Sequence, residues 1–482
     1  MTQIIPIIRE ISAGSKAVGG LFMKKRILAA ALILTLQFTF CGCNNTAEKE
    51  YSQMTSSETV SSEVSEIMES VVSAESSVEE KSENTSLPDI ESSLPAESSE
   101  QSVLQSSSVY ESSYIPYPQT SEFEVPAPDT SVVEDFEDKY FVKRLSREMQ
   151  YYFCNLYQAA ASYQKGVDFE RPLTEEEIST LMYLLNYDCP ELIHLSGDYY
   201  PYYDERDPSL YRGVGFIYSI PEQDYKSSRK KLDEYFDGLN NILSGKNELE
   251  KEKYVYDNIF YNCIYNESEA LSGSVYGSLI DGLGRCEAIS KGFMWCMRKL
   301  GIECLCVSGY PRWNAGSLYA EHSWNIVKIE DEWYHVDITV DNVQLTPEKS
   351  NLPHYGFFNA SDDMISDNRD IREVYTSLGI PVCSSKRLNY HVMNNQLILS
   401  DLCDEQHFHD ILRNHSTNEG IKALSVRFET KADYDYAFEH IEEWTNDFLA
   451  DNTDKGFYFN TYYNNVSKTI LTDVTFTNNA EG

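Results

Sequence analysis

Apolar residues recur at steps of three and four along five stretches of the chain, which is the spacing that places them on one face of an α-helix. In the first stretch Phe141, Leu145 and Met149 share such a face. A second stretch opens at Thr174, where three glutamates follow as in a capped helix start. The predicted helices are 134–165, 174–187, 222–243, 249–265 and 288–300.

Short runs of β-branched and aromatic residues predict strands in the second half of the chain. Two of these runs flank Asp331-Glu332 and predict an antiparallel hairpin. The predicted strands are 302–308, 322–330, 333–340, 424–428, 456–462 and 469–476, with one more helix over 432–449. A helix followed by an antiparallel sheet predicts an α+β fold.

Changes in composition along the chain indicate five parts. They are a signal peptide (1–43), a linker (44–133), a mostly helical region (134–270), a core (271–370) and a small α/β appendage (371–482). We expect the chemistry in the core, and the pattern of the appendage predicts none.

The N-terminal part has a basic patch at 23–26 and an almost uninterrupted apolar run over 27–40. This order is typical of a secretory signal, and the run is short for a membrane-spanning helix, which needs about 20 apolar residues. The end of the run, Gly42-Cys43, resembles a bacterial lipoprotein signal. The resemblance implies cleavage before Cys43 and lipidation of Cys43, which predicts a protein anchored on the outer face of the cytoplasmic membrane.

Serine and acidic residues dominate the linker, which has no Gly, Cys or Trp and cannot bury enough apolar surface to order itself. We expect a disordered tether there. The chain carries a formal charge of −38, and the linker accounts for a large share of it. Nucleic acid is excluded as a partner because such a surface repels phosphate backbones.

Three residues of the core have the types that thiol catalysis needs. Cys286 lies where a turn enters a helix, and the free N–H groups of a helix start favour thiolate over thiol. His322 could take the thiol proton, and Asp337 could hold the second imidazole nitrogen. Pairing the hairpin around its turn places Ile326 near Asp337, so His322 and Asp337 are a few residues out of register and a bulge would have to close the gap. Asp341 lies near enough to compete with Asp337.

Longer stretches around these positions support the same site. They are 276–282, 286–287, 301–304, 308–309, 322–325, 333–339 and 358–363. In combination they resemble the bacterial transglutaminase-like family over about residues 250–370, although Ala288 and Ile289 replace its usual Gly and aromatic residue. The resemblance implies a papain-like fold and acyl transfer through a thioester, with Cys286 as nucleophile, His322 as base and Asp337 as orienter.

Other candidate groups carry weaker signals. His407, His409 and Asp410 could bind a metal, but without further ligands at metal spacing they are typical of a plain surface, and we expect no metal and no cofactor. His335 could face the site, although packing is the simpler interpretation. The backbone N–H of Cys286 would contribute to an oxyanion hole, for which Tyr276 is a weak second donor.

The sequence thus predicts a surface-anchored thiol enzyme that acts on a peptide or protein, possibly one associated with the cell wall. Hydrolysis by a peptidase or amidase is the first interpretation, and cross-linking by a transglutaminase is the second. A non-catalytic binding protein with a transglutaminase-like scaffold stays open, because a fold does not determine a function.

Overall fold

The computed structural model describes residues 125–269, 271–312, 321–342, 352–416 and 423–477, which all belong to one structural unit. The predicted signal peptide with Cys43, and the linker up to residue 124, lie outside the described residues. The described residues begin slightly before the expected boundary at 134. Thr130–Val132 forms a 3-10 turn (η2), and Val133 is buried.

The region 134–270, expected to be mostly helical, also contains an antiparallel sheet of order β1-β3-β2. Its elements are α4 (Arg147–Ala161), β1 (Gly166–Leu173), α5 (Glu175–Tyr187), β2 (Leu195–Tyr203) and β3 (Tyr211–Tyr218). The sequence indicates irregular structure or strand over 199–218 and predicts neither β1 nor the strand pairing, because these strands carry tyrosines and glycines rather than a clear alternation. Gly213 of β3 lets the backbone of β1 approach closely, since a Cβ there would collide with the Val167 carbonyl oxygen.

The first predicted helix is shorter than expected. It begins at Arg147 because the hydroxyl of Ser146 caps it by accepting from the Met149 N–H at 3.2 Å. The preceding residues form two 3-10 turns, η3 (Phe136–Asp138) and η4 (Val142–Arg144). The turns still bury Phe141 and Leu145, so the apolar spacing reported burial correctly but not the helix boundary.

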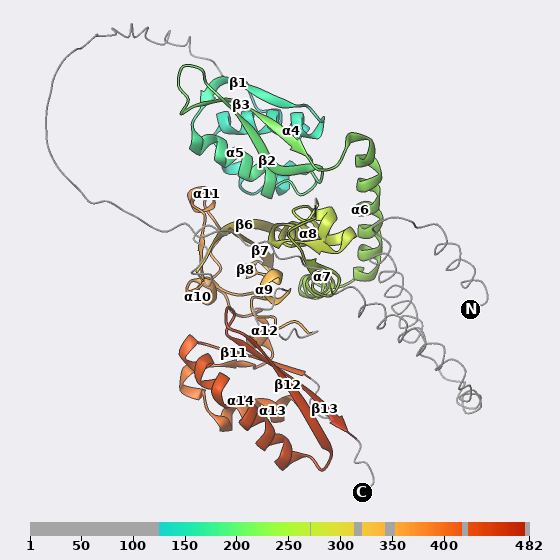
Figure 1. Ribbon diagram of the computed structural model, residues 1–482, viewed down its shortest axis with the longest axis vertical. Helices are drawn as coiled ribbons and strands as arrows, with labels where there is room; N and C mark the ends of the chain where they lie inside the picture. The colour runs from blue at the N-terminus through green and yellow to red at the C-terminus, as the bar shows by residue number, and fades with distance from the viewer. Residues whose placement is uncertain (1–124, 270, 313–320, 343–351, 417–422, 478–482) are drawn as a thin grey trace, which may run out of the picture. The chain divides into compact units, whose positions relative to one another are not determined.

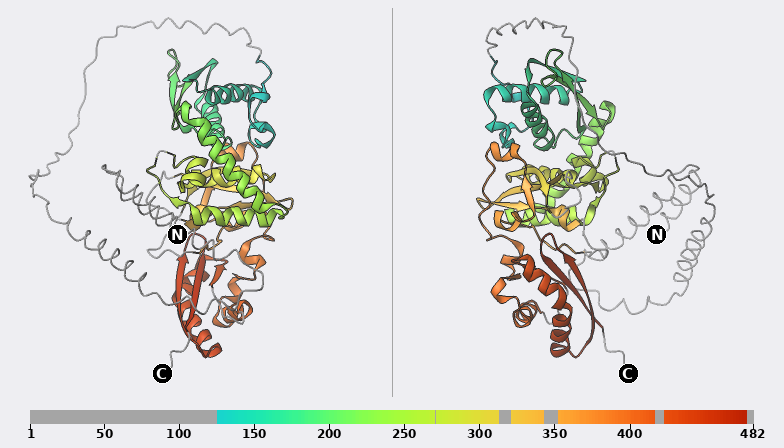
Figure 2. Two further views of the ribbon diagram at one scale, coloured as in Figure 1. Left: turned by 90° about the vertical axis from the view of Figure 1, so that its right-hand side faces the viewer. Right: turned by 60° about the vertical axis from the view of Figure 1, so that its left-hand side comes forward.

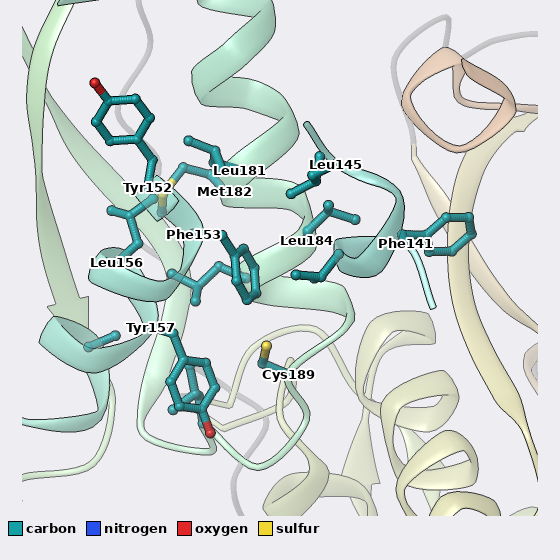
Figure 3. Close-up of a cluster of buried hydrophobic side chains, with 14 of the residues drawn as sticks. Phe141, Leu145, Tyr152, Phe153, Leu156, Tyr157, Leu181, Met182, Leu184 and Cys189 are labelled. Atoms are coloured by element: carbon teal, nitrogen blue, oxygen red, sulfur yellow. The ribbon is translucent and has the colours of Figure 1, made fainter. Parts of the chain in front are cut away.

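Side chains of α4 and α5 form the core of this region (Figure 3). Phe153 and Leu156 on α4 lie against Leu181 and Leu184 on α5, and all four are buried. The same cluster includes Trp324 of the core region 271–370. The N-terminal region therefore packs directly on the sheet that carries the candidate site.

Two long helices lead into the core. They are α6 (Glu222–Leu243) and α7 (Glu248–Asn262), which agree closely with the predicted spans. A capping box between Asn247 and Glu250 starts α7, because each side chain bonds the backbone N–H of the other residue.

The core packs one buried helix on an antiparallel sheet of order β8-β7-β6-β9, and α8 contacts β6 and β7 (Figure 1). Phe293 and Met294 on α8 are buried in one cluster with Cys306 on β6 and Val327 on β7. The elements are β4 (Ile264–Tyr265), a π-helix η5 (Gly277–Asp281), β5 (Leu283–Gly284), α8 (Cys286–Lys299), β6 (Cys304–Pro311), β7 (His322–Ile329), β8 (Glu332–Val336), α9 (Ile338–Asn342) and β9 (Arg369–Ile371).

The hairpin of β7 and β8 has a tighter turn than predicted. Glu330 and Asp331 both have positive φ, which is typical of a two-residue primed turn, and Ile329 pairs with Glu332. Ile326 therefore lies opposite His335 and not opposite Asp337. This shift of two residues brings Asp337 toward His322 without the bulge that the sequence analysis required.

The C-terminal module has a four-stranded sheet of order β10-β11-β13-β12. Figure 2 shows α13 and α14 on one face of that sheet, where Phe408 and Ile411 on α13 share a buried cluster with Ile441 and Phe448 on α14. Its elements are β10 (Leu397–Ile398), η6 (Ser400–Leu402), α13 (Glu405–His415), β11 (Ala423–Phe428), α14 (Lys431–Asn452), β12 (Gly456–Asn464) and β13 (Thr469–Thr477). The short helices α10 (Asp362–Ile365), α11 (Glu373–Ser377) and α12 (Tyr390–Met393) connect it with the core.

Candidate active site

Cys286 is the first residue of α8 and is half-exposed. The turn before it is held by parallel pairing of β5 with β4 and by the Arg285 N–H, which donates to Ser272 O at 2.8 Å. The side chain of Arg285, the N-cap residue, makes no capping hydrogen bond. The N–H groups of the first turn and the helix dipole therefore remain available to stabilise negative charge.

His322 and Asp337 are in direct contact. The Nε2 of His322 lies 2.8 Å from Oδ2 of Asp337, and the latter residue is fully buried. His322 is the first residue of β7, and Asp337 follows the last residue of β8, so the two adjacent strands bring them together. The Trp324 indole lies nearly parallel to the His322 ring, with centroids 6.0 Å apart, which restrains the imidazole.

The pKa of His322 shows which groups surround it. Burial alone would lower this pKa, but the Asp337 carboxylate and a hydrogen bond to Cys286 raise it to about 9. The imidazole of His322 therefore interacts both with the Cys286 thiol and with the Asp337 carboxylate, and its raised pKa lets it hold a proton near neutral pH.

Arg369 is a second cation on Asp337, and the sequence analysis did not identify it. Its Nη1 donates to Asp337 Oδ2 at 2.5 Å, and its side chain is fully buried. Burial would raise the pKa of Asp337, but His322 and Arg369 lower it to about 2. Asp337 is therefore ionised near neutral pH.

Asp341, the alternative orienter, faces other partners. Its Oδ2 accepts from the Tyr256 hydroxyl at 2.7 Å and from the Tyr355 N–H at 2.6 Å. Burial raises its pKa to about 7. The structure therefore places Asp337, and not Asp341, on the imidazole of His322.

His335, Asp362 and Cys383 place one ligating atom each within 4.8 Å of one another, so a metal has to be considered. The tautomer of His335 argues against it. Its Nδ1 accepts from Trp324 Nε1 at 3.1 Å, so Nε2 carries the proton and donates to Asp362 Oδ1 at 2.9 Å. A metal on Nε2 would require loss of that proton, and the three residues fit a hydrogen-bond network that fixes Trp324.

The histidines of α13 have structural contacts. His409 Nε2 bonds the carbonyl of Trp444 at 2.7 Å, and Asp410 pairs with Arg413.

Tyr276, the candidate oxyanion donor, accepts from Lys231 Nζ at 2.9 Å, which joins it to α6. Tyr265 on β4 was missed by the sequence analysis. It lies close enough for Cys286 to contribute to the raised pKa of its hydroxyl, after burial.

A polar cavity of about 420 Å³ lies beside residues that flank the site. Arg285 and Glu287 adjoin Cys286 in the sequence, Glu321 adjoins His322, and Tyr183 and Asp198 line the cavity from α5 and β2. Most of the charged side chains around the cavity form ion pairs with one another. The pairs are Arg285 with Glu287 (2.7 Å), Lys291 with Glu287 (2.6 Å) and Arg372 with Glu321 (2.6 Å). The N-terminal region thus contributes one wall of a cavity next to the site.

The core has a half-exposed cysteine at the start of a helix, and this helix packs on an antiparallel sheet. The sheet supplies a paired histidine and aspartate. This arrangement is that of a papain-like fold. The family comparison agrees with it. Residues 239–338 match the family model described as the transglutaminase-like superfamily, a segment that includes Cys286, His322 and Asp337. Over this segment the chain is similar to the transglutaminase-like superfamily, which consists generally of cysteine acyl-transfer enzymes and includes some inactive members.

Two solved structures have a partial likeness. A candidate cysteine protease from Cytophaga hutchinsonii is 18% identical over 22% of this chain and 37% of its own, with a TM-score of 0.20. A structure described as a TGase is 12% identical over 38% of this chain and 52% of its own, with a TM-score of 0.22. The match thus spans about half or less of each solved chain. The search of curated proteins found no match.

Proposed function

We propose that the protein is a thiol acyl-transfer enzyme that acts on an amide bond of a peptide or protein. Cys286 is the nucleophile, His322 the general base and acid, and Asp337 the residue that orients His322. The observation that carries the proposal is the imidazole of His322, which is hydrogen-bonded to Cys286 and lies 2.8 Å from an oxygen of the buried Asp337 carboxylate.

The chemistry follows from the charges of these groups. The proton of the thiol resides on His322 while the sulfur attacks the amide carbonyl, and the backbone N–H at the start of α8 faces the developing oxyanion. The imidazolium then protonates the leaving amine, and a thioester remains on Cys286. His322 next takes a proton from water or from a second amine, which releases the acid or forms a new amide.

Hydrolysis is the first choice between these outcomes, and cross-linking is the second. The test is a substrate screen that follows both release of acid from peptide amides and incorporation of a labelled primary amine into protein. Cys286→Ala should abolish both signals while the far-UV circular dichroism spectrum is unchanged. Turnover that persists in this variant would contradict the proposal.

Thiol labelling tests the nucleophile without a known substrate. All nine described cysteines are unpaired, and Cys403 is the other half-exposed one. Burial, with Asp433 and Asp404, raises the pKa of Cys403 to about 11, so it serves as an internal reference. We expect iodoacetamide to label Cys286 at least about tenfold faster than Cys403 near pH 7, because only a thiolate reacts. Equal rates would leave a non-catalytic scaffold as the better interpretation.

We also propose that lipid on Cys43 anchors the protein outside the cell, with the acidic linker as a tether. The Gly42-Cys43 motif supports this location. Within the described residues, no helix is long and apolar enough to cross a membrane. Metabolic labelling with a fatty-acid analogue should mark the wild type and not Cys43→Ala, and labelling of both would contradict the anchor.

A further inference from the structure

Arg369 contacts Asp337, the proposed catalytic aspartate, and the sequence pattern suggests no function for this arginine. It begins β9, whose Pro311↔Arg369 pairing with β6 places it beside the sheet. Its guanidinium donates to Oδ2 of Asp337, the same oxygen that His322 Nε2 approaches at 2.8 Å. One carboxylate oxygen is thus shared by two cationic groups.

The guanidinium is held rigidly. It lies over the Phe357 ring at 4.5 Å and the Trp324 ring at 4.9 Å, and its Nε donates to Asn368 Oδ1 at 2.9 Å. Trp324 is the same indole that stacks on His322. A buried arginine is expensive to desolvate, so the carboxylate, the amide and the two aromatic rings around this one indicate a specific function for its charge.

Counting charges shows what the arginine changes. With Arg369, the four groups Cys286, His322, Asp337 and Arg369 sum to zero both as thiol with neutral imidazole and as thiolate with imidazolium. Without Arg369 the same two states would both carry a net negative charge. A buried cluster avoids net charge by binding a proton, and the result would be a thiol beside an imidazolium, which is not nucleophilic.

We propose that Arg369 is a positioning and charge-balancing residue that lets the proton leave the Cys286 sulfur while Asp337 stays ionised. This inference rests on the proposed function, because it concerns the same thiol. It adds a fourth member, from a separate strand, to the proposed three-residue site.

Other titratable groups surround the cluster and are the same residues in every variant at position 369, although Arg369 also lowers the pKa of His335 and of Arg427. Asp367 faces Arg369 but pairs with Lys468 at 2.7 Å, and Arg427 also lies over Phe357, at 5.3 Å. The remaining neighbours are His335, Asp341 and Tyr256 near Asp337, and Arg285, Tyr265 and Cys306 near Cys286. Differences between variants at position 369 therefore report the charge of this one residue.

The experiment measures the rate of Cys286 alkylation by iodoacetamide from pH 4 to 10 in wild type, Arg369→Met and Arg369→Lys. In Arg369→Met the rising midpoint of the profile should move up by about one pH unit, so labelling well below the midpoint slows about tenfold. Arg369→Lys keeps the positive charge but not the planar guanidinium, whose Nη1 bonds Asp337 and whose Nε bonds Asn368. The midpoint of its profile should therefore stay near that of wild type, while its maximal rate of alkylation falls.

A matched control comes from Arg427→Met. Arg427 is equally buried and contacts the same Phe357 ring, but it donates to the backbone carbonyls of Gly356 and Met364 rather than to a carboxylate. Its removal should lower stability without moving the midpoint. If Arg369→Met does not fold, Arg369→Lys tests the proposal instead. A maximal rate of Cys286 alkylation equal to that of wild type would then show that Arg369 does not position Asp337.

The two proposals fail in different ways. If Cys286 of the wild type reacts no faster than Cys403, the proposed function is lost. If the wild type reacts quickly but the midpoint is the same in folded Arg369→Met, only the inference on Arg369 is overturned.

Discussion

At the scale of single residues, buried carboxyl groups of the core titrate in opposite directions because their neighbours differ. Asp337 contacts two cationic groups, and its pKa is lowered to about 2. Glu252 on α7 is equally buried but accepts only an amide hydrogen bond from Asn359, at 2.9 Å, and burial raises its pKa to about 8. Glu252 is therefore mostly protonated at neutral pH, as a neutral buried acid.

Glu252 predicts a pH dependence of stability. The folded state binds the Glu252 proton more tightly than the unfolded chain does, so its contribution falls from about pH 4.5 to about pH 8. In Glu252→Gln this loss is absent, and the free energy of unfolding relative to wild type should rise over that interval by a few kcal/mol. Urea unfolding at several pH values measures the difference.

A matched substitution controls for the change in net charge. Glu443→Gln removes the same formal charge from an exposed position on α14 and therefore measures the effect of the change in net charge alone. A pH-independent difference for Glu252→Gln would show that Glu252 is ionised in the folded state, contrary to this prediction.

Residue types also limited what the sequence could predict of the site. Cys286, His322 and Asp337 were found because their types and their surrounding motifs point to thiol chemistry, and the structure brings all three together. Arg369 lies in a stretch of polar residues that is typical of a surface turn. Only the tertiary contact with Asp337, 32 positions earlier, allows an arginine to be fully buried there.

At the scale of elements, prediction succeeded where apolar periodicity or a cap marks the helix. Helix α6 has the predicted bounds although its N-cap residue, Pro221, makes no side-chain capping hydrogen bond, and Thr174 forms the predicted capping box with Glu177. The β7–β8 register was wrong by two residues, because two residues in the left-handed region make a tighter turn than the sequence suggested. The missed sheet β1-β3-β2 depends on close backbone approach at glycines, which hydrophobic patterning does not report.

Gly309 gives a prediction about strand packing. It lies on β6, where an added Cβ would collide with the Asp370 carbonyl oxygen on β9 and come within 2.9 Å of the Trp324 ring. Gly309→Ala should push β9, and with it Arg369, away from Asp337. We expect a loss of about 1–3 kcal/mol in the free energy of unfolding and slower alkylation of Cys286.

Gly238→Ala on α6 is the matched control, because nothing lies within 4 Å of its added methyl group. It should stabilise the protein by about 0.5–1 kcal/mol, since alanine favours a helix over glycine, and leave the alkylation rate unchanged. If Gly309→Ala behaves in the same way, β9 does not depend on close approach to β6.

At the scale of the whole described unit, the C-terminal module is tied to the core beneath the site, although its sequence suggested only an appendage. Asn368 Nδ2 donates to the Val466 carbonyl at 3.3 Å, and Asn368 is the residue that accepts from Arg369. Arg427 of β11 reaches the core carbonyl of Met364 at 3.1 Å. The module therefore contacts and supports residues that neighbour Asp337.

Asn464, at the turn between β12 and β13, tests this coupling. Its Nδ2 donates to the Val340 carbonyl at 3.1 Å, and its Oδ1 accepts from the N–H groups of Val466 and Ser467, both at 3.2 Å. The Val340 N–H in turn donates to Asp337 Oδ1 at 3.3 Å. Asn464→Ala should lower the free energy of unfolding by about 1–3 kcal/mol and lower the maximal rate of Cys286 alkylation, whereas Asn460→Ala, at an exposed position of β12, should do neither.

The same contacts predict how the protein unfolds on heating. Because they cross between the C-terminal module and the core, both should unfold in one calorimetric transition. Two separate transitions, with an unchanged rate of Cys286 alkylation in Asn464→Ala, would show that the module is independent of the site.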